Sequence, residues 1–400
     1  MASQGVKHRR YRKKSDDMSL LRDWRGALQT PHVYRVGSSS VRVQTQCLIA
    51  LVILFVPLVF YAYPRIMNND CHSKINCREC SDHYVYNSTY PLTAPSKSSA
   101  GVTYKVSIIS DLDTDSKVQD KGLWVSHVKK GVLMWKPKER RISLHFDEKH
   151  ITLSSNIAMK DRGMELSELV TFDGKILTFD DRTGLVFYLE RDKIYPWIIL
   201  MDGDGKTAKG FKSEWAAVKD NLLYVGSMGK EWTTPGGDFV NNHPMWMKII
   251  SPRGDVRSVD WTDNYKKLRR AINIEFPGYM LHESGTWSEK RKSWFFLPRR
   301  CSGERYNETT DEVMSCNYLL TADEDFSRIQ TTKIVGRIPI RGFSSFKFLP
   351  DTDDTIIIAL KSEEYQGRTA TYITAFTIEG EILLADMKIA DLKFEGFEFV

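Results

Sequence analysis

The sequence lacks the short motifs that identify many enzymes and metal-binding proteins. It contains neither an HExxH nor a GxSxG pattern, the signatures of a zinc helix and a serine nucleophile elbow. Gly205–Thr207 resembles the end of a phosphate-binding P-loop, but Leu200 stands where the first glycine is required. An EF-hand loop starting at Asp111 would need glycine and glutamate where Ser116 and Gly122 stand. These four kinds of site are therefore set aside.

The sequence also has no long amphipathic helical pattern. Many short apolar runs alternate instead with turn sequences such as Asp173-Gly174, and the chain is rich in aromatic residues, with 10 Trp, 17 Tyr and 19 Phe. Aromatic side chains fit the pleated surface of sheets, and regular short strands with turns between them are typical of sandwiches, barrels and propellers. We therefore expect an all-β domain.

Basic charge is confined to the N-terminal arm. The formal net charge is +6, and residues 1–46 alone contain ten Lys or Arg and three Asp. The rest of the chain is therefore close to neutral, so the overall charge gives no argument for nucleic-acid binding and we expect none.

An uncharged run, Cys47–Tyr63, follows this arm. A helix of this length reaches about 26 Å, enough for a thin bilayer. A buried core helix or a cleaved signal peptide are the alternatives. The arginines and lysines before the run place that side in the cytoplasm, which predicts a single-pass type II anchor in the Golgi or endoplasmic reticulum membrane with a lumenal domain. Residues 64–100 have the composition of a stem.

Five cysteines follow the apolar run. Cys301 and Cys316 flank one short insertion, and we expect them to form a disulfide. Cys71, Cys77 and Cys80 remain in the stem, so at least one is unpaired and could link two chains as a homodimer. A zinc site at these three is the alternative. Asn87 and Asn307 begin N-glycosylation triplets, which agree with a lumenal location.

A repeat identifies the type of all-β domain. Five segments share a Ser or Glu, a short strand, a tight turn, a second strand and a charged cluster, and the fifth stops after its first strand. The run Lys105–Ser110 can supply the missing second strand. The sequence therefore predicts a five-bladed β-propeller over residues 101–400, closed by pairing of the C-terminal strand with the N-terminal blade. The five repeat starts are Ser167, Glu214, Glu283, Ser344 and Glu395.

The predicted geometry brings the repeat starts and the charged clusters to one end of the propeller. Carboxylates converging on a narrow axis would repel each other without a cation, and hard oxygen ligands favour Ca²⁺. The alternatives are ordinary polar strand ends or a purely structural ion. Among the clusters, Lys230, Arg299 and Arg300 could hold phosphate oxygens, while Asp111 and Asp181 could orient or deprotonate a water. The further candidates in these clusters are Glu231 as a catalytic residue, and Asp113, Arg182 and Lys361 as substrate-binding residues.

Several longer motifs resemble the calcium-activated nucleotidases, a family that includes the apyrases of blood-feeding insects. The resemblance extends from about residue 84 to Val400. It is carried by SDLDTD from Ser110, RGMELS from Arg162, DGDG from Asp202, GKEWTT from Gly229, WFFLPRR from Trp294 and GFSSFKF from Gly342.

The resemblance implies a five-bladed propeller with one central Ca²⁺ that hydrolyses nucleoside diphosphates, with UDP and GDP favoured in the membrane-anchored type. It places metal ligands on the five repeat starts and on Glu168, where the relatives carry Asp. It places Asp111, Asp181, Lys230, Glu231 and Arg299 in the nucleotide cleft. The expected role is removal of UDP left by glycosyltransferases, which supports glycan and proteoglycan synthesis. The alternatives are a secreted apyrase acting on ADP and ATP, and a non-enzymatic propeller that Ca²⁺ stabilises.

Overall fold

The computed structural model describes residues 32–36, 39–43, 56 and 84–400. The chain divides into two compact units, Met1–Tyr84 and Val85–Val400. In the first unit the described residues form a hairpin of β1 (His32–Val36) and β2 (Ser39–Val43). Apart from Val56, the predicted span at residues 47–63 lies outside the described residues, as do the stem cysteines. Within the part that is described, we find no helix with the length and apolar character needed to cross a membrane.

Four sheets of the second unit are regular, four-stranded and antiparallel, as expected for propeller blades. The first contains β9 (Leu166–Phe172), β10 (Lys175–Asp180), β11 (Leu185–Glu190) and β12 (Lys193–Ile199). The second contains β13 (Trp215–Lys219), β14 (Leu222–Gly226), β17 (Trp246–Ile250) and β18 (Val256–Asp260). The third contains β19 (Tyr279–Ser288), β20 (Ser293–Ser302), β21 (Tyr318–Asp323) and β22 (Ile329–Lys333). The fourth contains β23 (Arg341–Phe348), β24 (Ile356–Tyr365), β25 (Arg368–Thr377) and β26 (Ile382–Ala390).

The remaining large sheet has seven strands. It contains β27 (Phe394–Phe399), β4 (Gly101–Ser110), β6 (Leu123–Lys136), β5 (Lys117–Val118), β3 (Ser96–Ser98), β7 (Arg141–Phe146) and β8 (Ile151–Ser155). Since β6 is 14 residues long, it pairs with β8 along its first half and with β7 along its second. The prediction of five blades is therefore corrected to four regular blades. At the fifth position the long β6 pairs with additional strands, which makes a seven-stranded sheet.

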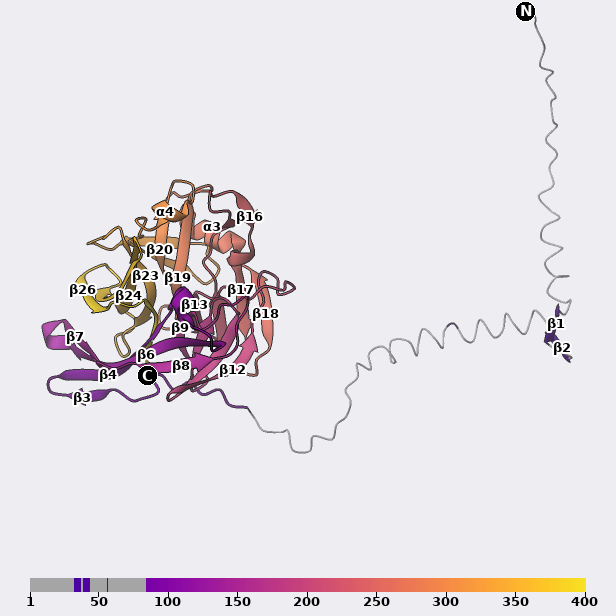
Figure 1. Cartoon of the computed structure of the whole chain (residues 1–400), viewed down its shortest axis with the longest axis horizontal. Coiled ribbons are helices and arrows are strands. Elements are labelled where there is room, and N and C mark those ends of the chain that lie inside the picture. Colours follow the sequence, from indigo (N-terminus) through magenta and orange to yellow (C-terminus); the bar gives the residue numbers. More distant parts are fainter. Residues whose placement is uncertain (1–31, 37–38, 44–55, 57–83) are drawn as a thin grey trace, which may run out of the picture. The chain divides into compact units, whose positions relative to one another are not determined.

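The C-terminal strand closes the ring as predicted. β27 pairs antiparallel with β4, in a register that aligns Phe394 with Ser110 and Phe399 with Val106. The first strands of the sheets contact one another in the order β9, β13, β19, β23, β27 and back to β9. Figure 1 shows β9, β13, β19 and β23 in the middle of this unit and β12, β18 and β26 towards its edge.

Every residue of β9 and β27 is buried, polar ones included. These inner strands are covered on both faces by their neighbours, which explains why they lack the polar–apolar alternation of strands with one solvated face. At Gly396 a Cβ atom would come within 2.6 Å of the Glu168 and Leu169 backbone, so glycine permits the close approach of β27 to β9.

Helices and minor strands occupy the connections. The two α-helices among the described residues are α3 (Thr262–Arg270) and α4 (Glu308–Asp311). Three short 3-10 helices span Asp113–Ser116, Pro137–Glu139 and His243–Met245, and β15 (Trp232–Thr233) pairs with β16 (Phe239–Asn241). Cys301 and Cys316 form the predicted disulfide, which closes the loop that carries α4. Residues 85–100, assigned to the stem from the sequence, belong to the second unit.

Candidate active site

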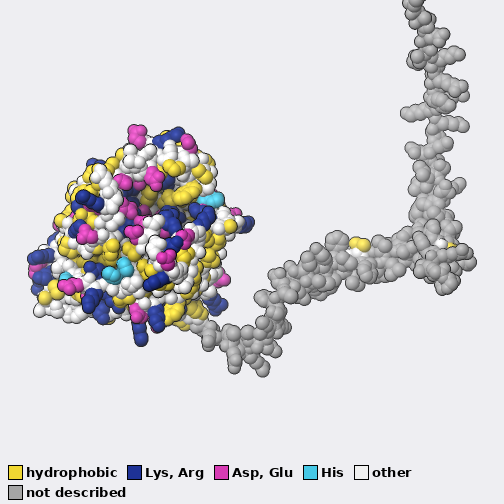
Figure 2. All heavy atoms as spheres, in the orientation of Figure 1, with side chains coloured by type: hydrophobic (Ala, Val, Ile, Leu, Met, Phe, Trp, Pro, Cys, Tyr) yellow, Lys and Arg dark blue, Asp and Glu magenta, His cyan; other side chains and the backbone are white. Residues whose placement is uncertain are grey.

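The starts of the inner strands surround a cavity of about 430 Å³ at one mouth of the ring. Glu214 directly precedes β13, Glu283 lies in β19 and Glu395 lies in β27, and all three line the cavity. Figure 2 shows acidic and basic side chains intermingled around a hollow on the face in view. The cavity also brings together six of the residues predicted from the charged clusters: Asp111, Asp113, Asp181, Arg182, Arg299 and Arg300.

Arg299 lies at the centre of the acidic ring. Its Nη1 contacts Glu283 and lies 2.9 Å from Glu395 Oε1, while its Nη2 contacts Glu364. The arginine is almost fully buried, so these contacts are poorly screened by water. Although burial lowers the pKa of Arg299, the three carboxylates outweigh it and raise the pKa well above its ordinary value.

Two lysines, the partly buried Lys212 and the buried Lys393, pair with other acids of the cavity. Lys212 contacts Asp181 and lies 2.6 Å from Glu214 Oε1. Lys393 Nζ lies 2.9 Å from Asp111 Oδ2 and 2.6 Å from Asp113 Oδ2. The cavity therefore alternates negative and positive groups without a continuous patch of either sign.

The ring carboxylates are buried, which disfavours their charged form unless a cation lies beside them. Burial raises the pKa of Glu214 to about 8, and the attraction of Lys212 offsets this only in part. Burial likewise raises the pKa of Glu283, and that of Glu395 well above its ordinary value. The Ser344 hydroxyl, at the start of the fourth repeat, is fully buried and has no hydrogen-bond partner among the described residues. Three carboxylates and a hydroxyl with free lone pairs fit a hard divalent cation such as Ca²⁺.

Ser167 and Glu168 have other partners. Ser167 Oγ donates a hydrogen bond of 2.5 Å to the Ser213 carbonyl, next to Glu214. The Glu168 carboxylate accepts hydrogen bonds from Leu169 N and Ser345 Oγ and lies 3.4 Å from Lys347. Burial raises the pKa of Glu168 to about 7. The Glu168 side chain is thus bound to Ser345, the residue after Ser344, and among the described residues it shares no hydrogen-bond or ion-pair partner with Glu214, Glu283 or Glu395.

Three residues predicted from the charged clusters do not line this cavity, and neither do the predicted metal ligands Ser167, Glu168 and Ser344. Glu231 forms two hydrogen bonds, of 2.7 and 2.9 Å, with the buried Arg269 of α3. Lys361, on β24, pairs with Asp386 at 2.8 Å. Lys230 lies 4.1 Å above the ring of Tyr306, which does line the cavity. The chain after β14 therefore turns Glu231 towards α3, and the catalytic role predicted for it is not supported by this placement.

Residues that the sequence reasoning missed complete the site. Lys212 and Lys393 each stand two residues before a ring glutamate, so a closer alignment of the repeats would have identified them as equivalent. The signal for Tyr306 and Asp311 is weaker, because they come from the loop closed by the disulfide and not from the repeat. Glu364, near the end of β24, belongs to the charged cluster that also contains Lys361.

Asp181 Oδ1 lies 3.4 Å from Arg182 Nε, an ion pair that leaves room for a further hydrogen bond. Oxygen atoms of Asp111, Glu165 and Asp181 lie within 4.8 Å of one another. Glu165 is held by Arg162 and Arg182, whereas Asp181 Oδ1 has no hydrogen-bond partner among the described residues. A buried carboxylate oxygen with a free lone pair can orient a water molecule and accept its proton.

The fold and the site define a β-propeller protein with an acidic axial site for a divalent cation. The chain matches the family model described as Apyrase over residues 112–400 and belongs to this family. It is 50% identical over 315 residues to "Soluble calcium-activated nucleotidase 1" of Rattus norvegicus, which covers 79% of this chain and 78% of the relative. It is 44% identical to "Apyrase" of Cimex lectularius, over 92% of this chain and 99% of the relative. The resemblance inferred from the motifs is confirmed.

Proposed function

We propose that this protein is a Ca²⁺-dependent nucleotidase that hydrolyses nucleoside diphosphates to monophosphates and phosphate, with UDP and GDP as the favoured substrates. Membership of the apyrase family and the name of the rat relative support the activity and the metal. The observation that carries the proposal is the single cavity in which Glu214, Glu283 and Glu395 lie among buried cations.

The ring residues would hold the metal. Glu214, Glu283, Glu395 and the unpartnered Ser344 hydroxyl are the ligands that the geometry favours, with Ser167 beside them. Bound there, Ca²⁺ would offset the charge of the carboxylates and polarise phosphate oxygens.

The cations of the cavity can position the diphosphate. Arg299 offers a planar fork of N–H donors that matches the oxygens of a phosphate, and Lys393 and Arg182 line the same cavity. Since phosphoryl transfer is catalysed mainly by positioning and charge stabilisation, fixed buried cations suit this reaction. Tyr306 provides an aromatic surface at the cavity wall.

The attacking water can be oriented by Asp181. Its free Oδ1 accepts a hydrogen bond from the water and then its proton, while the water oxygen bonds to the terminal phosphorus. The bond from that phosphorus to the bridging oxygen breaks, which yields the nucleoside monophosphate and inorganic phosphate. Asp111, held by Lys393, lies on the same side of the cavity.

We further propose the membrane setting and the blade assignment. The basic arm and the run at 47–63 support a type II anchor in the Golgi or endoplasmic reticulum, where removal of UDP would sustain glycosylation and proteoglycan synthesis. An unpaired stem cysteine would support a homodimer. The contact of β27 with both β23 and β9 supports a fifth blade formed by the seven-stranded sheet.

Phosphate release from UDP, GDP, ADP and ATP, each with Ca²⁺, Mg²⁺ or chelator, tests the proposal. We expect UDP and GDP hydrolysis with Ca²⁺, and loss of activity with chelator. Glu283→Gln should lower the rate at least about 100-fold, because it removes a ring carboxylate, whereas the exposed Glu379→Gln should not. UDP hydrolysis that is unaffected by chelator would contradict the metal role. A preference for ADP and ATP would favour a secreted apyrase, and metal-dependent melting without turnover a non-enzymatic propeller.

A further inference from the structure

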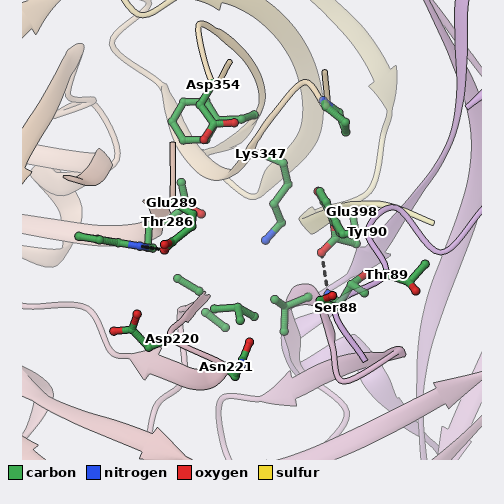
Figure 3. A pocket seen from close by; sticks show the side chains of 18 of the residues that line it. Ser88, Thr89, Tyr90, Asp220, Asn221, Thr286, Glu289, Lys347, Asp354 and Glu398 are labelled. Carbon is green, nitrogen blue, oxygen red and sulfur yellow. Dashed lines mark hydrogen bonds between the residues drawn. The ribbon is translucent and has the colours of Figure 1, made fainter. Parts of the chain in front are cut away.

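A second cavity, of about 650 Å³, opens at the other mouth of the ring. The inner strands that start at the candidate active site end at this cavity, and the two cavities share no lining residue. Figure 3 shows it from close by. Glu214, Glu283 and Glu395 line the first cavity. Val218, Trp287 and Glu398, a few residues further along the same strands, line the second.

Two hydrogen-bond donors in this cavity lack sufficient acceptors. Lys347, on β23, is 6% exposed, and Figure 3 shows its amino group pointing into the cavity. Its one ion pair among the described residues is a contact of 3.4 Å with Glu168, although an ammonium has three N–H donors. Thr171 is 8% exposed, and its hydroxyl has no hydrogen-bond partner in the described part of the chain. Buried donors without acceptors are costly, so an acceptor from a ligand would be stabilising.

The acidic groups of the cavity are already satisfied. Glu398 accepts hydrogen bonds of 2.8 Å from Tyr90 OH, from Thr171 N and from Phe399 N. The acids at the rim have partners too: Asp220 with Lys219, Glu289 with Lys292, Asp351 with Lys97 and Asp354 with Ser288. The lining carries five carboxylates and one ammonium, that of Lys347. Because each carboxylate has a partner, the unmet polar capacity lies with this ammonium, which favours a ligand with a single anionic group.

Much of the wall is apolar. Val170, Ala217, Trp287 and Phe348 line the cavity, and the segment 86–90 contributes two tyrosine side chains. A volume of about 650 Å³ is within the range of small-molecule sites, and apolar walls with a few fixed polar groups are their usual composition. The ligand should thus combine an anionic group with an apolar body.

We propose that this cavity binds a small carboxylic acid with an apolar body. Its carboxylate accepts a hydrogen bond from Lys347 Nζ, and its body packs against the apolar walls around Trp287 and Phe348. The site is independent of the proposed nucleotidase activity, because none of its lining residues belongs to the candidate active site.

Calorimetric titration of the full chain with 2-naphthoate and 2-naphthamide tests this, with titration into the same solution without protein as the blank. The two probes share an apolar body and differ in charge. We expect naphthoate to bind one molecule per chain, at least about tenfold more tightly than naphthamide. Lys347→Met should reduce naphthoate affinity to the naphthamide level, whereas Lys97→Met, which removes the same charge from the exposed rim, should not.

Thr286→Trp provides a second test, because it fills the cavity without removing a charge. It should abolish binding of both probes while the melting temperature stays within a few degrees of wild type. The proposal is overturned if naphthoate does not bind, if both probes bind equally, or if binding survives Lys347→Met or Thr286→Trp. Should Lys347→Met fail to fold, the comparison of the probes and Thr286→Trp still decide.

Discussion

At the scale of single residues, buried lysines of this protein divide into two groups. Burial lowers the pKa of Lys212, but Asp181 and Glu214 outweigh it and raise the pKa above its ordinary value. Lys230 and Lys248 have no such close carboxylate partners, and burial lowers the pKa of each to about 8. The first group stays charged throughout the physiological range, whereas the second loses its charge just above it.

Lys230 should make substrate binding sensitive to alkaline pH. Its amino group is protonated below about pH 8 and neutral above, so its attraction for phosphate is lost as pH rises through that value. We expect the KM for UDP to rise between pH 7 and 9.5 in the wild type, and this rise to be much smaller in Lys230→Arg, whose guanidinium stays charged. Identical KM profiles for the two proteins would show that Lys230 does not contact the substrate.

Lys248 should affect stability in the same pH range. Its Nζ donates hydrogen bonds to the Gly203 carbonyl at 2.5 Å and to Ser258 Oγ at 2.8 Å, and the residue is fully buried. Because its folded pKa of about 8 is below the ordinary value of 10.5, the unfolded chain binds the proton more tightly between these values. Folding stability of the wild type should therefore increase relative to Lys248→Met as pH rises from about 8 to 10.5.

Urea unfolding at pH 7.5 and pH 9.5 measures this difference. The exposed Lys206→Met serves as the control, since it makes the same substitution at the surface. If the stability difference between wild type and Lys248→Met is the same at both pH values, the lowered pKa is not present in the folded protein.

At the scale of elements, the loop closed by Cys301 and Cys316 carries part of the cavity wall. It holds α4, and both Tyr306 and Asp311 line the candidate active site. The Asn307 side chain caps α4 by accepting hydrogen bonds from Thr309 N and Thr310 N. The geometry of this wall thus depends on a cross-link and a cap rather than on sheet pairing.

Removal of the disulfide should destabilise the fold and loosen this wall. A cross-link with a sequence separation of 15 residues stabilises by about 3 kcal/mol in the chain-entropy model. We expect the double variant Cys301→Ser and Cys316→Ser to lose about this much in urea unfolding and to show a raised KM for UDP. Chemical reduction of the wild type should reproduce both effects. The same treatment should leave the double variant unchanged. An unaltered KM would mean that the loop does not contact the nucleotide.

At the scale of the whole molecule, the ring is held closed by its last strand. Phe397 and Phe399 of β27 are fully buried in the core shared with β4 and β24. Glu395 of the same strand lines the candidate active site. Closure of the fold and completion of the site therefore depend on the same six residues.

Truncation before Phe394 should prevent cooperative folding. Phe397→Ala, a milder change, should cost about 3–5 kcal/mol because it leaves a cavity in the core. Leu392→Ala, just outside the strand and 36% exposed, should cost about 1 kcal/mol or less. Chemical denaturation of the three proteins measures these differences, and equal losses for Phe397→Ala and Leu392→Ala would contradict the role of closure.

The sequence by itself determined the all-β class, the inner strands, the closure by the C-terminal strand and the disulfide. Each of these follows from a local pattern or from residues that repeat at equivalent places. The run Lys105–Ser110, predicted as a strand, lies within β4 for this reason. The convergence of Glu214, Glu283 and Glu395 also follows, because equivalent ends of antiparallel strands meet at one edge.

Only the tertiary structure decided which charged groups pair. Glu231 and Lys361 follow the repeat, yet their side chains meet Arg269 and Asp386, which lie far away in the sequence. The long β6 gathers extra strands into the last sheet, and Lys347 meets Glu168 from across the ring. Burial and charge pairing depend on distances between remote segments, which no local pattern contains. The acidic axial ring and Arg299 were thus readable in the sequence, whereas the pairing of the charged groups and the second cavity were not.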